Sequence, residues 1–416
     1  MRENLLKTIG PGLIFAAAAV GVSHLVQSTR AGASFGLGLI AWIVLANLIK
    51  YPAFRFGPEY AAATGTSLLE GYRRQGKWAL VLYALLTLGT MFSVQAGVTV
   101  VTAALASALG LGSNPVVISG VILALCAAIL AVGKFKWLDR IVKVLVAIFT
   151  VTTVLATLLV LPKISWGEIP FWIAPADFDL KTTLFLAALI GWMPSAIDVA
   201  VWNSLWTLAK NNESQHKANT HEAILDFHVG YFGTVALALS FVLLGAGVMY
   251  ASDISFAESA GGFASQILDL YAQTLGEWAR PLIGVCALVV MFSTTLTVLD
   301  GFPRAITTLI DRFQSEEVQD TPDRSGGRAY WVTVLVQALG ALLILHLFLR
   351  GLPQLIDIAT TLSFLTAPAL AVLNHRAMYR ENVPEELRPK GWLRALSLFG
   401  IAALSLFALV YLYLIL

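Results

Sequence analysis

Residues 10–32 read GPGLIFAAAAVGVSHLVQSTRAG, and this stretch decides the fold. Its apolar run is long enough to enter a bilayer, but Gly21-Val22-Ser23-His24 interrupts it, and polar residues follow within two turns. Irregular backbone at membrane depth is tolerated only where protein or a water-filled cavity satisfies its N–H and C=O groups. The stretch therefore predicts a broken membrane helix with a binding site at the break.

The composition places the whole chain in a membrane. Of its 416 residues, 58% are hydrophobic and only 12% are charged, whereas about a quarter of the residues in soluble domains are charged. The mean hydropathy is +0.78. The net charge is +2, and Lys and Arg are spread among the loops, which excludes a nucleic-acid partner. Cys126 and Cys286 lie in apolar runs and are expected to be small buried hydrophobes.

Apolar segments of about 20 residues, the length that crosses a bilayer, recur along the chain. We predict eleven of them, at 10–29, 36–60, 78–110, 115–133, 141–162, 183–209, 223–251, 279–301, 330–349, 353–373 and 393–415. No linker separates a second folded unit, so residues 1–416 are expected to form one transmembrane domain. The first segment has no small-residue cleavage site after it and is interpreted as the first span, not as a removable signal.

The distribution of Lys and Arg predicts the orientation. With the N-terminus in the cytoplasm, 22 of the 27 basic residues lie at the inner ends and loops of these spans. The five on the outer side are Arg30, Lys163, Lys181, Arg280 and Arg350. The positive-inside rule therefore predicts a cytoplasmic N-terminus and a C-terminus outside, and we expect the membrane to be the inner membrane of a bacterium.

The sixth span contains a second helix break. It reads LFLAALIGWMPSAIDVAVWNSLW. Pro194 removes a backbone hydrogen-bond donor, and Gly191 tolerates non-helical backbone conformations. A simple proline kink would give the same local pattern. Breaks in spans one and six, however, are where an inverted repeat of five plus five helices places corresponding elements. We therefore predict an interrupted helix at Gly191-Trp192-Met193-Pro194-Ser195, facing the first break across a shared cavity.

Six short motifs are spread over most of the chain: GPGLIF at 10–15, QSTRAGASFG at 27–36, the spacing from Asn47 to ATG at 63–65, Met193-Pro194, Asp226 and STTLT at 293–297. Together they resemble the NRAMP family of proton-coupled divalent-metal transporters. The resemblance implies an all-α polytopic membrane protein with the LeuT-type fold, which has two inverted five-helix repeats, an eleventh helix and breaks in helices 1 and 6. The repeats would span about 10–162 and 183–373, with the extra helix at 393–415.

The sequence departs from the family at its most specific motif. The family has Asp-Pro-Gly-Asn in the first break, and this chain has Gly21, Val22, Ser23 and His24 at those positions. The family's Met-Pro-His in the sixth span is Met193-Pro194-Ser195 here. A dehydrated divalent ion is costly to hold without a negative ligand, and these changes remove the carboxylate. The architecture is therefore better supported than the metal cargo.

The candidate residues at the breaks fall into three groups. The substrate-binding candidates are Gly21, Ser23, His24, Gln27, Ile190, Met193, Ser195 and Asp198. The candidates for a proton or charge path are His24, Lys50, Asp198, Asp226 and Asp300. The metal-ligand candidates are His24 and Met193, which supply an imidazole and a thioether.

Some of these candidate residues could have a structural role instead of a functional one. Asp198 could pair with a neighbouring base, and His24 could fix the unwound backbone by hydrogen bonds. Lys50 lies past the middle of its span, which favours snorkelling or structural pairing over a place in the cavity. Two hydroxyls, those of Ser23 and Ser195, stand at the starts of half-helices, where a small anionic or zwitterionic solute would suit the positive helix ends.

These patterns predict a secondary active transporter that works by alternating access. The resemblance implies a metal cation and a coupling proton, and the lost motif favours a small anionic or zwitterionic non-metal solute. Against an enzyme, the chain has no phosphate-binding loop, zinc-ligand helix pattern or nucleophile elbow. No cofactor is expected. The predicted partners are a small ion or solute, a proton and the lipid bilayer.

Overall fold

The computed structural model describes residues 8, 10–132, 135–164, 166, 167, 170–252, 257, 259–314, 327–348 and 352–415. Within these ranges the chain forms helices and connecting turns, and no strand occurs. Every predicted apolar span coincides with a helix or with a pair of helices. The all-α class predicted from the sequence is therefore confirmed.

The helices that correspond to the eleven predicted spans are, in order, α2 (Pro11–Ala19) with η1 (Ser23–Ser28) and α3 (Thr29–Phe35), α4 (Ile40–Thr64), α6 (Lys77–Ala108), α7 (Pro115–Val132), α8 (Phe135–Val160), α9 (Leu180–Gly191) with α10 (Asp198–Ser214), α11 (Thr220–Leu244) with η4 (Gly245–Met249), α13 (Ala279–Gln314), α14 (Arg328–Phe348), α15 (Leu352–Met378) and α16 (Gly391–Ile415). In the part of the chain that the structure describes, eight helices are long and apolar enough to cross a membrane. The bent pair of the first span makes a ninth.

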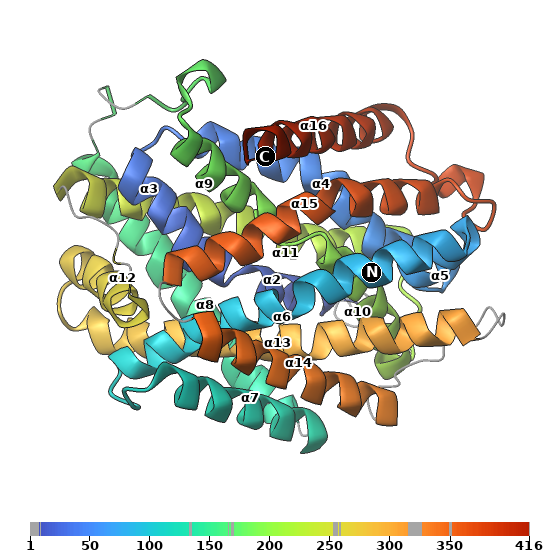
Figure 1. Ribbon diagram of the computed structural model, residues 1–416, viewed down its shortest axis with the longest axis horizontal. Helices are drawn as coiled ribbons and strands as arrows, with labels where there is room; N and C mark the ends of the chain where they lie inside the picture. The colour runs from blue at the N-terminus through green and yellow to red at the C-terminus, as the bar shows by residue number, and fades with distance from the viewer. Residues whose placement is uncertain are drawn as a thin grey trace.

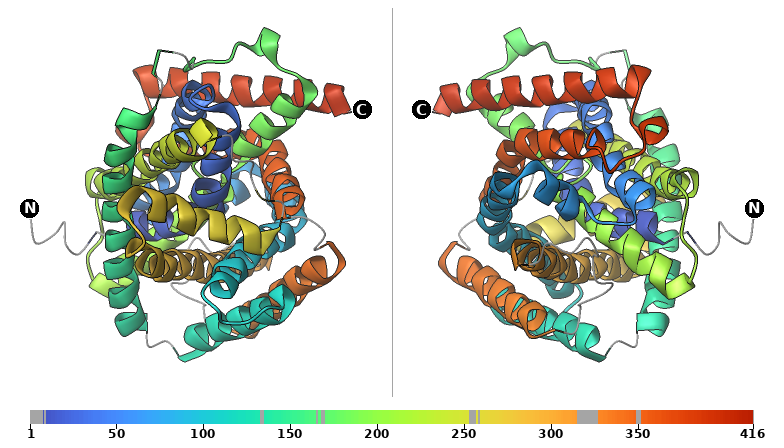
Figure 2. Two further views of the ribbon diagram at one scale, coloured as in Figure 1. Left: turned by 90° about the vertical axis from the view of Figure 1, so that its left-hand side faces the viewer. Right: turned by 90° about the vertical axis from the view of Figure 1, so that its right-hand side faces the viewer.

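Two short helices connect spans at opposite ends of the bundle. They are α5 (Leu68–Gln75), between α4 and α6, and α12 (Ala260–Leu275), between η4 and α13. Figure 1 shows α5 at the right-hand end and α12 at the left-hand end. In the views of Figure 2, α16 lies along one edge of the bundle and α7 with α14 along the opposite edge. The broken first span runs through the middle of the molecule (Figure 1).

The first span packs closely on α11 because both helices carry glycine where they touch. A Cβ on Gly12 would lie 2.0 Å from the backbone oxygen of Asp226, and a Cβ on Gly230 would lie 2.0 Å from the backbone oxygen of Gly12. Small residues of this kind let membrane helices approach to backbone contact. The side chain of Asp226 completes the junction, accepting hydrogen bonds from the backbone N–H groups of Gly10 at 3.0 Å and Gly12 at 2.6 Å.

Charged clusters hold the two ends of the bundle. At the end where α3 lies, Arg30 makes a two-pronged ion pair with Asp357 of α15, at 2.7 and 3.0 Å. At the α5 end, the fully buried Glu70 accepts from Arg73 and Arg74 and from Arg312 of α13. Burial alone would raise the pKa of Glu70, but the Arg73 guanidinium, together with Arg312 and Arg74, holds it below its ordinary value.

Candidate functional site

Both predicted breaks are present, and they face one another. In the first span, α2 ends at Ala19 and η1 begins at Ser23, with a bend of 49° between the two halves. In the sixth span, α9 ends at Gly191 and α10 begins at Asp198. The Met193-Pro194 peptide bond between them is cis. Ser23 Oγ lies 3.4 Å from the carbonyl oxygen of Pro194, so the breaks are in direct contact.

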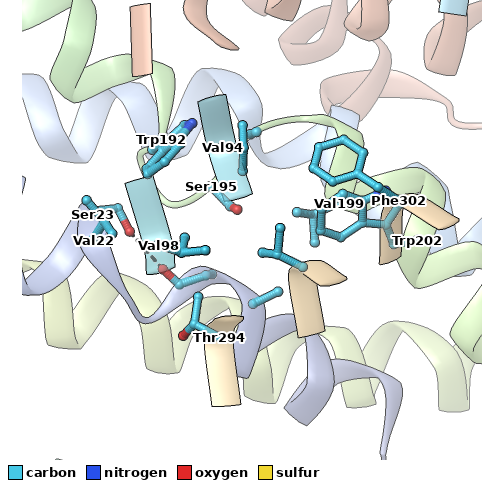
Figure 3. Close-up of a pocket in the computed structure, with 14 residues that line it drawn as sticks. Val22, Ser23, Val94, Val98, Trp192, Ser195, Val199, Trp202, Thr294 and Phe302 are labelled. Atoms are coloured by element: carbon cyan, nitrogen blue, oxygen red, sulfur yellow. Dashed lines mark hydrogen bonds between the residues drawn. The ribbon is translucent and has the colours of Figure 1, made fainter. Parts of the chain in front are cut away.

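A cavity lies between the breaks and is closed on its other sides by α6 and α13. It contains about 400 Å³ of space between atoms, part of it open to solvent. Figure 3 shows Ser23, Ser195 and Thr294 around this space, with Trp192 near one end and Trp202 with Phe302 near the other. The complete lining is Ala18, Ala19, Val22, Ser23, Val94, Val98, Trp192, Ser195, Ala196, Val199, Trp202, Thr294, Val298 and Phe302.

The cavity lining is apolar apart from three hydroxyls and two indole N–H groups. It contains no carboxylate, imidazole, thiol or thioether. Across the described residues, no three His, Cys, Asp or Glu side chains come close enough together to hold a metal ion. Divalent cations require oxygen, nitrogen or sulfur ligands and a compensating negative charge, and the lining side chains supply three hydroxyl oxygens and no negative charge.

Two side-chain hydroxyls lie within hydrogen-bond distance of backbone carbonyls at the first break. The hydroxyl of Thr294, from α13, lies 2.8 Å from the carbonyl oxygen of Ala17 and 3.0 Å from that of Val20. Ser23 Oγ lies 2.7 Å from the carbonyl oxygen of Ala19. Carbonyls freed by an interrupted helix are the groups that bind cations in transporters of this architecture. At this break two hydroxyls of the chain itself lie beside these carbonyls, and each hydroxyl donates its single proton to one acceptor at a time.

At the second break, the side chain of Lys50 forms hydrogen bonds with backbone carbonyl groups. Its Nζ, carried by α4 and fully buried, donates to the carbonyl oxygens of Ile190 at 3.0 Å, Gly191 at 3.1 Å and Ser195 at 2.7 Å. The expectation that Lys50 snorkels is wrong, because the ammonium is held by carbonyls in the interior. The alternative of structural pairing is the one observed.

His24 is buried completely and has a hydrogen-bond partner for each ring nitrogen. Nε2 lies 2.9 Å from the carbonyl oxygen of Thr234 in α11, which only accepts, so Nε2 carries a hydrogen. Nδ1 lies 2.7 Å from Ser23 Oγ. In the neutral ring Nδ1 accepts the Ser23 hydroxyl proton; in the imidazolium Nδ1 donates, and that hydroxyl turns to the carbonyl of Ala19.

Asp198 occupies the first turn of α10, immediately behind the cavity wall formed by Val199 and Trp202. Its side chain is 1% exposed, and Thr87 of α6 donates to it over 3.4 Å. Within the described residues it has no ion pair with Lys or Arg at 4.0 Å or less. A carboxylate at this point neutralises the positive end of the α10 dipole, which removes the feature that would attract an anion.

Of the eight predicted substrate-binding residues, Ser23 and Ser195 line the cavity, and the other six are not among its lining residues. Met193 is fully buried. Gln27 donates to Asp357 at 3.1 Å, close to the Arg30 ion pair. A Cβ on Gly21 would meet Thr294 at 2.9 Å, so this glycine permits close packing on α13.

The remaining charge-path candidates lie away from the cavity. Asp226 caps α2, and Asp300 accepts from Arg304 at 2.6 Å and from Tyr330 at 2.6 Å. Their role in a proton path, and that of His24, Lys50 and Asp198, stays a prediction.

Most residues of the cavity wall could not be predicted from the sequence. Val94, Val98 and Val298 are ordinary membrane-helix residues, and nothing in their spacing separates a cavity wall from a lipid-facing or core position. The sequence context of Thr294 and Trp192 did point to the site. Thr294 lies within STTLT at 293–297, and Trp192 lies inside the predicted second break. Polar and aromatic residues in such positions could have been assigned to the site.

The fold is similar to those of solved membrane transporters. A manganese transporter of Eremococcus coleocola superposes with a TM-score of 0.71 at 13% identity, covering 98% of this chain and 86% of that one. MhsT in complex with L-phenylalanine superposes with a TM-score of 0.67 at 14% identity, covering 97% and 98%. At these identities the likeness concerns the fold. Together with the paired breaks, it defines the chain as an integral membrane protein with the LeuT-type transporter fold.

The family is shown by the sequence itself. Residues 12–414 match the family described as natural resistance-associated macrophage protein-like. An uncharacterized protein of Pasteurella multocida (strain Pm70) is 35% identical over 412 residues, which cover 97% of this chain and 91% of the relative. The chain belongs to the NRAMP family. It is a secondary transporter and not an enzyme.

Proposed function

We propose that the protein transports a small non-metal solute with an apolar body and no net charge, either uncharged or zwitterionic, by alternating access. The lining of the cavity between the two breaks carries this proposal. Alanine, valine and aromatic side chains form most of that wall, and Ser23, Ser195 and Thr294 supply a few hydrogen-bonding groups. Sites for small organic molecules have this composition.

Charge balance around the cavity supports a solute without net charge. Lys50 occupies the carbonyl groups at the negative end of α9, and Asp198 occupies the positive end of α10. A free cation or anion would therefore meet a helix end whose partial charge the chain already neutralises. A metal cation is the second candidate, because the chain belongs to the NRAMP family and Met193 stands within the second break.

Uptake into proteoliposomes distinguishes the two candidates. Purified protein would be assayed with labelled Mn²⁺, with small neutral amino acids and with uncharged small organic solutes, beside empty liposomes. We expect saturable uptake of a solute from the organic group and none of Mn²⁺. Saturable Mn²⁺ uptake that falls sharply in Met193→Ala would support the metal cargo instead.

We further propose that transport is linked to protons through His24. The support is the pair of hydrogen-bond arrangements open to its ring, since protonation redirects the hydroxyl of Ser23, a cavity residue, toward Ala19. A transported solute should therefore accumulate in response to an imposed pH gradient in the unaltered protein. In His24→Gln, whose amide does not titrate, the response should be lost while exchange of labelled for unlabelled solute remains. An unchanged response in His24→Gln would contradict this role.

The orientation proposed from Lys and Arg is a cytoplasmic N-terminus and a C-terminus outside, in a bacterial inner membrane. Its support is the excess of basic residues at one end of the spans, and the α5 end, with Arg73, Arg74 and Arg312, would face the cytoplasm. A reporter fused after the last residue, one active only outside the cytoplasm, would test it. No activity from this fusion, together with activity of a reporter that works only in the cytoplasm when fused at the same point, would contradict it.

A further inference from the structure

The environment of Lys50 is that of an ion site. Three carbonyl oxygens, those of Ile190, Gly191 and Ser195, lie 2.7–3.1 Å from one nitrogen atom, Nζ of the fully buried Lys50. Two of them end α9 and the third belongs to the break, where the helical hydrogen-bond pattern stops. The carbonyl oxygen of Ile190 also accepts from the backbone N–H of Met193 at 3.2 Å. An ammonium has three N–H donors, and here each has one acceptor.

The charge of this group is compensated by dipoles alone. In the described residues no carboxylate lies within 4.0 Å of the Nζ atom, and its other neighbour is the ring of Phe54, whose centroid is 5.5 Å away. Backbone carbonyls at the C-terminal end of a half-helix, with the negative end of its dipole, are a recognised setting for a bound monovalent cation in membrane transporters. A buried cation without such a setting would be very costly.

We propose that the carbonyls of Ile190, Gly191 and Ser195 form a monovalent-cation site that the ammonium of Lys50 occupies permanently, as a tethered ion. The break in the sixth span then keeps its shape without a dissolved cation. The side chain reaches the site from α4, a different helix, so the same three bonds also fix α4 against the end of α9 and the break that follows it. This inference concerns the ion at the break and does not depend on which solute the cavity takes.

Removing the tethered ion should create a site for a free one. In Lys50→Ala the three carbonyls lose their donors, and the vacated stem leaves space for a small cation. We expect the melting temperature of the purified variant in detergent to fall below that of the unaltered protein. Methylammonium, or an alkali cation such as Na⁺, should restore it with a saturable concentration dependence. The unaltered protein should show no such cation-specific shift, with choline chloride used to hold the ionic strength constant.

Two further variants keep the test decisive. Lys210→Ala removes a part-exposed lysine that pairs with Glu213 and should show no cation-specific shift. Lys50→Gln retains donors but has no charge, so it should melt below the unaltered protein even if Lys50→Ala yields too little folded material. The proposal is overturned if Lys50→Ala is insensitive to methylammonium and to every alkali cation, or if Lys50→Gln melts at the same temperature as the unaltered protein. Neither result would affect the proposed cargo, because no transported solute enters the assay.

Discussion

Ala196→Phe should abolish transport while leaving the protein folded. Ala196 lines the cavity from the second break, and its side chain is 8% exposed. A phenyl ring there would project into the space that the proposed solute occupies. The solute could then no longer contact the cavity wall. We expect uptake to fall at least about tenfold, which corresponds to a loss of about 1.4 kcal/mol of binding free energy.

The matched control is Ala402→Phe on α16, where the alanine is exposed and the added ring meets no cavity. Both variants would be purified, checked for a single symmetrical elution peak and assayed for uptake side by side. Retained uptake in Ala196→Phe, at the level of Ala402→Phe, would show that the solute does not pass through this cavity.

Gly191→Ala should have the largest effect on stability. A Cβ at this position would lie 1.9 Å from the carbonyl oxygen of Thr360 and 2.8 Å from its carbonyl carbon, so α15 would have to move away from α9. Overpacking usually costs about 1–3 kcal/mol and sometimes more, and here the obstacle is backbone, which yields less than a side chain. The same shift would disturb the carbonyl of Gly191 that accepts from Lys50.

Gly89→Ala on α6 is the control for this prediction. A Cβ there has no atom within 4 Å, and alanine in place of glycine within a helix stabilises it by up to about 1 kcal/mol. Thermal unfolding of the two purified variants should therefore move in opposite directions relative to the unaltered protein. Equal melting temperatures for Gly191→Ala and Gly89→Ala would contradict the contact between α9 and α15.

The breaks could be predicted because their signals are local. Gly191 and Pro194 remove helical constraints within four residues, and the glycine and serine near His24 do the same in the first span. The span count and the all-α class follow from apolar length, which depends on composition alone. These parts of the fold therefore follow from the sequence with little help from tertiary contacts.

The identity of the cavity wall depends on tertiary approach and could not be predicted in the same way. Val94 of α6 and Val298 of α13 reach the breaks only because two distant helices cross there. Lys50 illustrates the same limit, since its position past the middle of a span favours snorkelling, whereas its acceptors lie about 140 residues further along the chain. The partner of a buried charge is a tertiary property, and hydropathy patterns do not contain it.

The loss of the family's acidic motif gains a physical meaning from these contacts. At the first break the hydroxyls of Thr294 and Ser23 lie within hydrogen-bond distance of backbone carbonyls, and at the second break Lys50 donates to three of them. At both breaks, therefore, side chains from other helices contact the backbone carbonyls and hold the helices together. What remains open to a solute is an apolar space with three hydroxyls.

The most direct test of this account is equilibrium binding to the purified protein, measured in parallel for Mn²⁺ and for a panel of small uncharged and zwitterionic solutes, with Ala196→Phe and Met193→Ala beside the unaltered chain. The account predicts saturable binding of an organic solute that disappears in Ala196→Phe and persists in Met193→Ala, and no saturable binding of Mn²⁺. Saturable Mn²⁺ binding that is lost in Met193→Ala, with no organic solute bound, would contradict it.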